Sequence, residues 1–303
     1  MILVTGATGA SGSAVIREFA RRELPVRALV RDRARLVRAG VPSGVEVARG
    51  DMLEPETLRS ALDGVETALM ISSADQRLVD TQRGFIDAAK RSGVRHIVKF
   101  SGRGCWSDSE FRFARMHAEI EQYLERSGLA WTHLRPGQFM HVYFREVPTI
   151  IHDRVLRLPM ANARLSPVDV EDIAKVAVSL LHSEGHEGKR YEMTGPEALT
   201  MGEVAETISR VTDKPIRYVD VDPDEKNKEL LEAGIPAFFA EAMDELFSSR
   251  RKNLEEARVD LRTHEAFDVS PTSFETFAHR HLEVFRGQAA PTHLWASGWL
   301  PEQ

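Results

Sequence analysis

The sequence predicts an α/β protein with a doubly wound parallel sheet and a smaller α+β lobe toward its carboxyl end. Short apolar runs alternate with amphipathic stretches over the first half of the chain, which is typical of βαβ units. A glycine-rich segment follows the first apolar run directly, and the alternation becomes less regular after Pro136. With 303 residues, of which 42% are hydrophobic, the chain can bury a core of this size.

The first half contains six candidate strands, each short and apolar. We expect these strands at 2–5, 26–30, 45–49, 67–71, 96–100 and 130–134. Between them, apolar residues recur at three- and four-residue spacing, which indicates amphipathic helices. We expect these helices at about 12–22, 55–63, 78–92 and 111–127. This order of elements favours a doubly wound sheet.

The second half carries the elements of a smaller lobe. A helix over 170–182 and a strand near 190–193 should come first. Thr200 and Glu203 have the spacing of a capping box, which predicts a helix from there to about residue 211. Further elements are a strand near 216–219 and helices around 224–233, 237–249 and 271–285. We expect one domain from residues 1–150, joined by 166–195, and a second lobe from 151–165 and 196–303.

Composition excludes several kinds of partner and site. The net charge is −6, and the only tight basic run, Arg250-Arg251-Lys252, is interpreted as a solvated loop, so a nucleic-acid partner is not expected. Cys105 is the only cysteine, which excludes an internal disulfide and a cysteine-based zinc cluster; we expect no metal site. A single cysteine, without an amino-terminal signal or a long apolar segment, favours a cytoplasmic protein that does not enter the membrane.

The strongest motif is the glycine-rich segment Gly6-Ala-Thr8-Gly9-Ala10-Ser11-Gly12, which lies between the first strand and the first helix. Glycines are required where a chain turns tightly and its backbone approaches a pyrophosphate. The amide groups at the following helix N-terminus then bind the phosphates. The segment therefore predicts a Rossmann-type domain that binds a nicotinamide dinucleotide.

Residues after the second and third strands bear on the choice of nucleotide. Arg31 follows the second strand, where an arginine accommodates a 2′-phosphate, so NADP(H) is favoured over NAD(H). The neighbouring Asp32 could serve a ribose instead, which keeps NAD(H) open. Asp51 and Met52 follow the third strand, and Asp51 could accept from the adenine amino group or be an ordinary loop residue.

Together these motifs resemble the NmrA-like group of atypical short-chain dehydrogenases/reductases, which includes NADPH:quinone reductases and triphenylmethane reductase-like enzymes. The resemblance covers most of residues 1–195. It is carried by the glycine segment, Val30-Arg31-Asp32, Gly50-Asp51, Ser101-Gly102, the segment Ser127 to Phe139, and Val168-Asp169-Val170-Glu171-Asp172.

The resemblance implies further residues around the nicotinamide end of the cofactor. Ile71, Ser72, Ser73 and Ser101 would line the nicotinamide ribose. Pro136, Gly137, Gln138 and Phe139 would lie beside the nicotinamide ring. We expect substrate contacts from Cys105, Trp106, His141, Tyr143 and Phe238, although each could equally be an ordinary packing residue.

The sequence departs from the wider superfamily at the catalytic pair, a tyrosine with a lysine four residues later. No tyrosine in this chain has a lysine at that spacing, and the corresponding segment is Phe113-Ala-Arg-Met-His117. Because phenylalanine cannot transfer a proton, ordinary interconversion of ketone and alcohol is doubtful. His117 is the candidate catalytic residue, since imidazole moves protons near neutral pH; otherwise it is a surface histidine of a helix.

A quinone or extended aromatic acceptor suits a site without that pair, because its reduced oxyanion is delocalised and water can protonate it. We therefore expect hydride transfer from NAD(P)H to a quinone-like or polycyclic aromatic substrate. Oxygen-dependent follow-on chemistry, as in natural-product tailoring, is a variant of this expectation. An apolar set at near-helical spacing, Phe238, Phe239, Met243 and Phe247, could cover the pocket or simply form core.

Two other functions stay open. A non-catalytic NmrA-like redox sensor would bind the dinucleotide and act through a protein partner. For that role the tail around Trp295 and Trp299 is the candidate surface. A third possibility is a reductase that acts on a carbon–carbon double bond or a lactol, as in the isoflavone-reductase branch. The protein should be a monomer or a homodimer.

Overall fold

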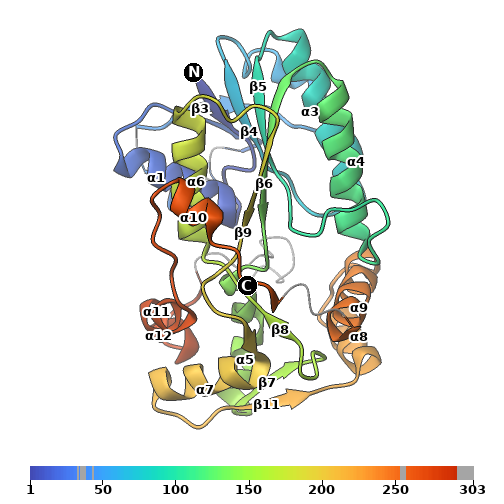
Figure 1. Ribbon diagram of the computed structural model, residues 1–303, viewed down its shortest axis with the longest axis vertical. Helices are drawn as coiled ribbons and strands as arrows, with labels where there is room; N and C mark the ends of the chain where they lie inside the picture. Colours follow the sequence, from blue (N-terminus) through green and yellow to red (C-terminus); the bar gives the residue numbers. More distant parts are fainter. Residues whose placement is uncertain (33, 35–38, 43, 253–256, 292–303) are drawn as a thin grey trace.

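The computed structural model describes residues 1–32, 34, 39–42, 44–252 and 257–291. A seven-stranded, all-parallel sheet in the order β3-β2-β1-β4-β5-β6-β9 forms the larger part (Figure 1). Its strands are β1 Ile2–Val4, β2 Arg27–Val30, β3 Glu46–Arg49, β4 Thr67–Met70, β5 His96–Phe100, β6 Ala130–Pro136 and β9 Lys189–Met193. The predicted doubly wound class is confirmed.

Helices cover both faces of this sheet. On one face lie α1 Ala10–Arg21 and α6 Val170–His182, which pack on each other and share one apolar core. The opposite face carries α3 Leu78–Arg91 and α4 Arg112–Arg126 over a second core (Figure 1). Because the chain order reverses between β1 and β4, the strand ends leave a crevice there, which is where open α/β sheets bind ligands.

A smaller lobe lies beyond the carboxyl ends of the strands (Figure 1). It contains two short sheets, one pairing β7 with β11 in parallel and one pairing β8 with β10 antiparallel. Its strands are β7 Val155–Leu158, β8 Arg164–Leu165, β10 Leu199–Thr200 and β11 Arg217–Asp220. Its helices are η2 Met140–Glu146, α5 Val147–His152, α7 Met201–Thr212, α8 Pro223–Glu232, α9 Ala237–Lys252, α11 Phe274–Arg280 and α12 Leu282–Phe285; the short α10 Arg262–Ala266 contacts β9.

Most sequence-based elements agree with the structure, and the capping box of α7 is present on Thr200 and Glu203. Two predicted helices are wrong. The segment 55–63 forms only a short 3-10 helix, η1 Pro55–Leu58, because the Thr57 hydroxyl accepts from the Asp51 amide (2.9 Å) and donates to the Glu54 carbonyl (2.7 Å). The segment 271–285 is divided at His281, whose ring packs on Phe277.

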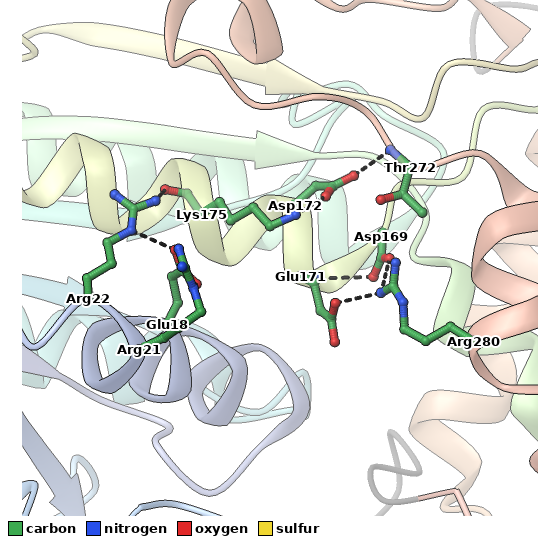
Figure 2. Close-up of polar contacts among 9 residues, drawn as sticks. All are labelled: Glu18, Arg21, Arg22, Asp169, Glu171, Asp172, Lys175, Thr272 and Arg280. Carbon is green, nitrogen blue, oxygen red and sulfur yellow. Dashed lines mark hydrogen bonds and ion pairs between the residues drawn. The ribbon is translucent and has the colours of Figure 1, made fainter.

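Carboxylates near the start of α6 connect it to a later part of the chain (Figure 2). Asp169 caps the helix by accepting from the Glu171 amide (3.0 Å), and it also accepts from Arg280 (2.7 Å). Asp172 accepts from the Thr272 amide (2.7 Å). The acidic motif at 168–172 therefore stabilises the join between α6 and residues 272–280.

Within the described ranges, no helix is both long enough and apolar enough to span a membrane. The tail expected to cover an apolar surface falls partly outside the described residues, and both Trp295 and Trp299 lie in that part.

Candidate active site

A cleft of about 1600 Å³ extends from the carboxyl ends of the sheet strands into the smaller lobe. Its lining brings together all of the residues that the sequence assigned to the cofactor, from the glycine segment to residues 136–139. His117 and Trp106 also line it. The other expected substrate residues, Cys105, His141, Tyr143 and Phe238, are not part of this lining.

The glycine segment is a cradle that side chains would fill. Gly6 has a left-handed backbone (φ 60°), and a Cβ at Gly12 would lie 2.2 Å from the Gly6 carbonyl oxygen. Gly9 precedes α1 and provides no side-chain cap, so the first-turn amides of α1 keep no intrahelical acceptor and border the cleft. These amides and the positive end of the helix dipole suit a pyrophosphate, so the loop fits a dinucleotide.

The structure separates the two candidates for the adenosine ribose. Arg31 is exposed and lines the cleft, and among the described residues no carboxylate lies within ion-pair distance of it. Asp32 is outside the lining, and its Oδ1 accepts from the Ala34 amide (2.9 Å). Asp51 borders the cleft, and its Oδ1 accepts a hydrogen bond from the Leu53 amide (3.0 Å). The arrangement therefore fits a 2′-phosphate better than an acidic ribose contact.

Residues 136–139 form a fixed wall of the cleft. The Gly137 amide donates to the Met193 carbonyl (2.8 Å), and the Met140 amide donates to the Val168 carbonyl (2.9 Å). Phe139 is buried against Phe100, edge to face, with ring centroids 6.1 Å apart. Because both backbone and ring are held, this wall can exclude water from the space in front of it.

Gln138 connects this wall to the C-terminal lobe. Its Oε1 accepts from buried Arg250 of α9, and its Nε2 donates to the Tyr143 hydroxyl (3.3 Å). The interpretation of the basic run 250–252 as a solvated loop is therefore wrong. The run forms the last turn of α9, where Arg251 pairs with Asp220 (2.8 Å) and Lys252 with Glu110 (3.6 Å).

His117 lies on α4 at the position where the superfamily's lysine would be, and it has a lysine partner from another element. Lys99 of β5 is completely buried, and its Nζ lies 2.7 Å from Nδ1 of His117. Burial, and then the nearby Lys99 charge, hold the pKa of His117 well below its usual value. Sequence reasoning missed Lys99; its only signal was a charged residue within an otherwise apolar strand.

A buried ion pair lies one helical turn beyond His117. Arg135 of β6 donates through Nε to Glu121 (3.0 Å), and both side chains are almost completely buried. Glu121, Glu125 and His133 lie close enough together to hold a metal ion, but Arg135 and Arg190 already pair with the two carboxylates. The cluster is therefore charge-balanced by arginine.

The expected substrate residues occupy different surroundings. Trp106 is 54% exposed, borders the cleft and lies beneath the Arg135 guanidinium, 5.2 Å from ring centroid to Cζ. Cys105 is buried with Sγ donating to the Gly102 carbonyl (2.6 Å), and burial raises the pKa of its thiol. His141 and Tyr143 pack within the lobe core, against Phe277 and Phe274 respectively. Phe238 packs on Phe113.

The lobe side of the cleft is mostly apolar. Its contributors are Val142, Phe144, Leu158, Met160, Leu165, Met201, Leu230, Ile235, Phe239, Met243, Leu246 and Phe247. Charged residues interrupt this surface, among them Arg145 and a buried ion pair in which Lys226 donates to both oxygens of Glu146 (3.1 Å each). A flat, hydrophobic ligand could occupy this part of the cleft while its reacting end faces His117 and Phe139.

Comparison with known proteins gives a consistent picture. Residues 1–278 match the NmrA-like family. An NAD(P)H azoreductase of Xenophilus azovorans is 38% identical over 248 residues, which cover 82% of this chain and 86% of that protein. A (4-alkanoyl-5-oxo-2,5-dihydrofuran-3-yl)methyl phosphate reductase of Streptomyces griseus is 35% identical over 286 residues, covering 94% and 99%. A solved NADPH-dependent quinone oxidoreductase of Escherichia coli, complexed with NADPH, has a TM-score of 0.82 at 27% identity, covering 93% and 99%.

Proposed function

Since this chain belongs to the NmrA-like family and is an NAD(P)H-dependent oxidoreductase, we propose that it transfers hydride to a quinone-like or polycyclic aromatic acceptor held beneath the C-terminal lobe. NADP(H) is the favoured cofactor, with NAD(H) as a second candidate. One observation carries the proposal: the glycine cradle and the apolar lobe surface border the same continuous cleft. A dinucleotide and a flat acceptor can therefore lie in contact.

Different residues of the chain would bind different parts of the cofactor and the acceptor. The first-turn amides of α1 and the Arg31 guanidinium would hold the phosphates, and the fixed wall at 136–139 would exclude water from the reacting face. When bound, NAD(P)H supplies the hydride. Trp106, exposed at the rim, offers an aromatic surface for stacking a flat acceptor.

The proposed acceptor class fits a site without the superfamily's tyrosine. Phe113 stands where the superfamily has tyrosine, and Tyr143 lies in the lobe core outside the cleft lining, where burial raises its pKa. A delocalised acceptor such as a quinone gives a stabilised oxyanion after hydride transfer, so it does not require a strong acid next to it. Follow-on reaction of the reduced product with oxygen, as in natural-product tailoring, would need no further residue of this chain.

A conjugated lactone is a second candidate acceptor, because the Streptomyces relative is a reductase of a 5-oxo-2,5-dihydrofuran. Such a ring, like a quinone, accepts hydride at a carbon conjugated to a carbonyl group. The sensor alternative is not supported, since the relatives named above are reductases. We expect turnover rather than cofactor binding alone.

The proposal is tested by following oxidation of NADPH and NADH at the nicotinamide absorbance with benzo-, naphtho- and polycyclic quinones, with and without oxygen. A butenolide belongs in the same panel. We expect faster oxidation of NADPH than of NADH, with quinones the better acceptors. Tight cofactor binding without turnover on any acceptor would refute the proposal and favour the non-catalytic sensor instead.

A further inference from the structure

The buried pair of Lys99 and His117 has no evident purpose in holding the fold together. Lys99 is completely buried, and among the described residues no carboxylate lies within 4 Å of its Nζ, so it forms no salt bridge there. Its contacts are Nδ1 of His117 at 2.7 Å and the Phe100 carbonyl at 3.5 Å. Burying an ammonium group next to an imidazole costs stability, which points to a functional reason for keeping it.

The contact fixes the tautomer of His117. An ammonium group has only donors, so Nδ1 of His117 must accept from Lys99 and the ring proton must sit on Nε2. His117 borders the cleft whereas Lys99 does not. His117 therefore offers an N–H group to the cleft, with a proton source behind it.

An isolated neutral imidazole would be a poor acid, because loss of its Nε2 proton leaves an imidazolate. That difficulty disappears if Nδ1 receives a proton in the same event, since the ring then stays neutral. Burial lowers the pKa of Lys99 to about 8, so its ammonium group is a far better acid near neutral pH than an ordinary lysine.

We propose that Lys99 and His117 form a two-residue proton relay, in which the Lys99 ammonium protonates Nδ1 of His117 while Nε2 gives its proton to the reduced acceptor. The Nζ–H and Nε2–H bonds break, and the Nδ1–H bond and one bond from hydrogen to the acceptor form. Lys99 is left as a neutral amine, the imidazole stays neutral, and the acceptor loses its negative charge. Water in the cleft later returns a proton to Nε2, and Nδ1 returns its proton to Lys99.

The surroundings of Lys99 keep its charge balanced without capturing its proton. The titratable and charged groups around it are Cys105, His117, Glu121, His133 and Arg135. Burial is the main influence on Lys99; the thiol and carboxyl groups act to raise its pKa and the guanidinium acts to lower it. Because Glu121 is already bound by Arg135, it adds negative potential but does not take the Lys99 proton.

The relay rests on the proposed hydride transfer. It would allow the enzyme to reduce acceptors that need a proton immediately after they take the hydride. An azo bond becomes a strongly basic anion after taking hydride and needs a proton at once. A quinone needs one less urgently, and a triphenylmethane carbocation needs none, because hydride alone gives its neutral product. Dependence on the relay should therefore decrease in the order azo dye, quinone, carbocation dye.

The kinetic test compares Lys99→Met with the unmodified enzyme in single-turnover reactions with NADPH. With methyl red we expect the unmodified rate to fall as pH rises through about 8, where Lys99 loses its proton. The variant should be slower by about tenfold or more and lose this pH dependence. With malachite green the two proteins should react alike. Lys90→Met is the matched control, because Lys90 is an exposed lysine whose one side-chain hydrogen bond within the described part of the chain goes to the Ser127 carbonyl.

A second measurement uses neither cofactor nor acceptor. Nitrogen-15 NMR of the free protein should show His117 as the Nε2–H tautomer, and Lys99→Met should change it to a mixture of tautomers. Equal rate losses on all dyes, an unchanged pH profile, or an Nδ1–H tautomer in the unmodified protein would each overturn the relay. Absence of turnover on every acceptor by the unmodified enzyme would instead refute the proposed function, and the NMR result would still stand.

Discussion

Replacing Arg31 with alanine should change cofactor preference with little effect on the fold. Arg31 is exposed, borders the cleft at the end of β2 and has no described ion-pair partner, so its removal leaves no buried charge behind. NADPH differs from NADH only by the 2′-phosphate that this guanidinium would bind. We therefore expect NADPH binding to weaken and NADH binding to stay nearly constant.

The size of the effect follows from the exposure of the site. Two unit charges about 4 Å apart interact by about 1 kcal/mol at the dielectric constant of water. A phosphate carrying nearly two charges gives about 2 kcal/mol, and salt reduces this toward about 1.4 kcal/mol, which is about tenfold in the dissociation constant. The loss should shrink further as ionic strength rises.

The assay is titration of each cofactor by calorimetry or by nicotinamide fluorescence, at low and at physiological salt. Asp32→Ala is the matched control, since Asp32 is the neighbouring residue, lies outside the cleft lining and binds the Ala34 amide. It should leave the preference for NADPH unchanged. Equal losses for NADPH and NADH in the arginine variant would refute the assignment of Arg31 to the 2′-phosphate.

Three further changes test other parts of the site. Gly12→Ala places a Cβ 2.2 Å from the Gly6 carbonyl oxygen. It should therefore lower the free energy of unfolding in urea by about 1–3 kcal/mol and weaken NADPH binding. Gly202→Ala is the control, because the nearest atom to its Cβ is 3.7 Å away, and it should change neither quantity. Trp106→Ala should raise KM for a polycyclic quinone roughly two- to tenfold without altering the dissociation constant of NADPH, because a stacked aromatic pair is worth about 0.5–1.5 kcal/mol; an unchanged KM would exclude stacking there. Burial is the largest influence on the pKa of Glu121 and raises it, but the hydrogen bond from Arg135, together with the nearby His133, Ser101 and Lys99, outweighs burial, so the net shift is downward. Its stabilising effect is therefore complete above about pH 4.3 and lost as pH falls through the lowered value, so Glu121→Gln should cost about 3–5 kcal/mol at pH 7 and less at pH 3. Equal costs at both pH values would contradict this.

The fold was largely predictable because its signals are local. The predicted strands recur in the parallel sheet and the capping box lies where its spacing indicated. The segment 55–63 has a helical pattern of apolar residues, yet the hydroxyl of Thr57 binds nearby backbone and holds a tighter turn. A side chain that competes for backbone hydrogen bonds is not visible in hydrophobic periodicity.

The cofactor half of the candidate site could similarly be predicted from the sequence. The glycine segment and Arg31 are recognisable because a short stretch of sequence carries the chemistry that they need, and the structure gathers them around one cleft. The acceptor half was harder to anticipate. His141 and Tyr143 were reasonable candidates by position, but the structure packs them within the lobe core, and Trp106 is the expected substrate residue that borders the cleft.

The sequence by itself determined the parallel sheet and the dinucleotide loop, and it favoured a phosphorylated cofactor, because each depends on residues close together in the chain. Tertiary structure alone decided the rest. It brings Lys99 of β5 to His117 of α4, and it brings Arg250, the buried member of the basic run, to Gln138 across 112 residues. Such pairs form only when separate elements pack, and nothing in the local pattern of either partner specifies the other.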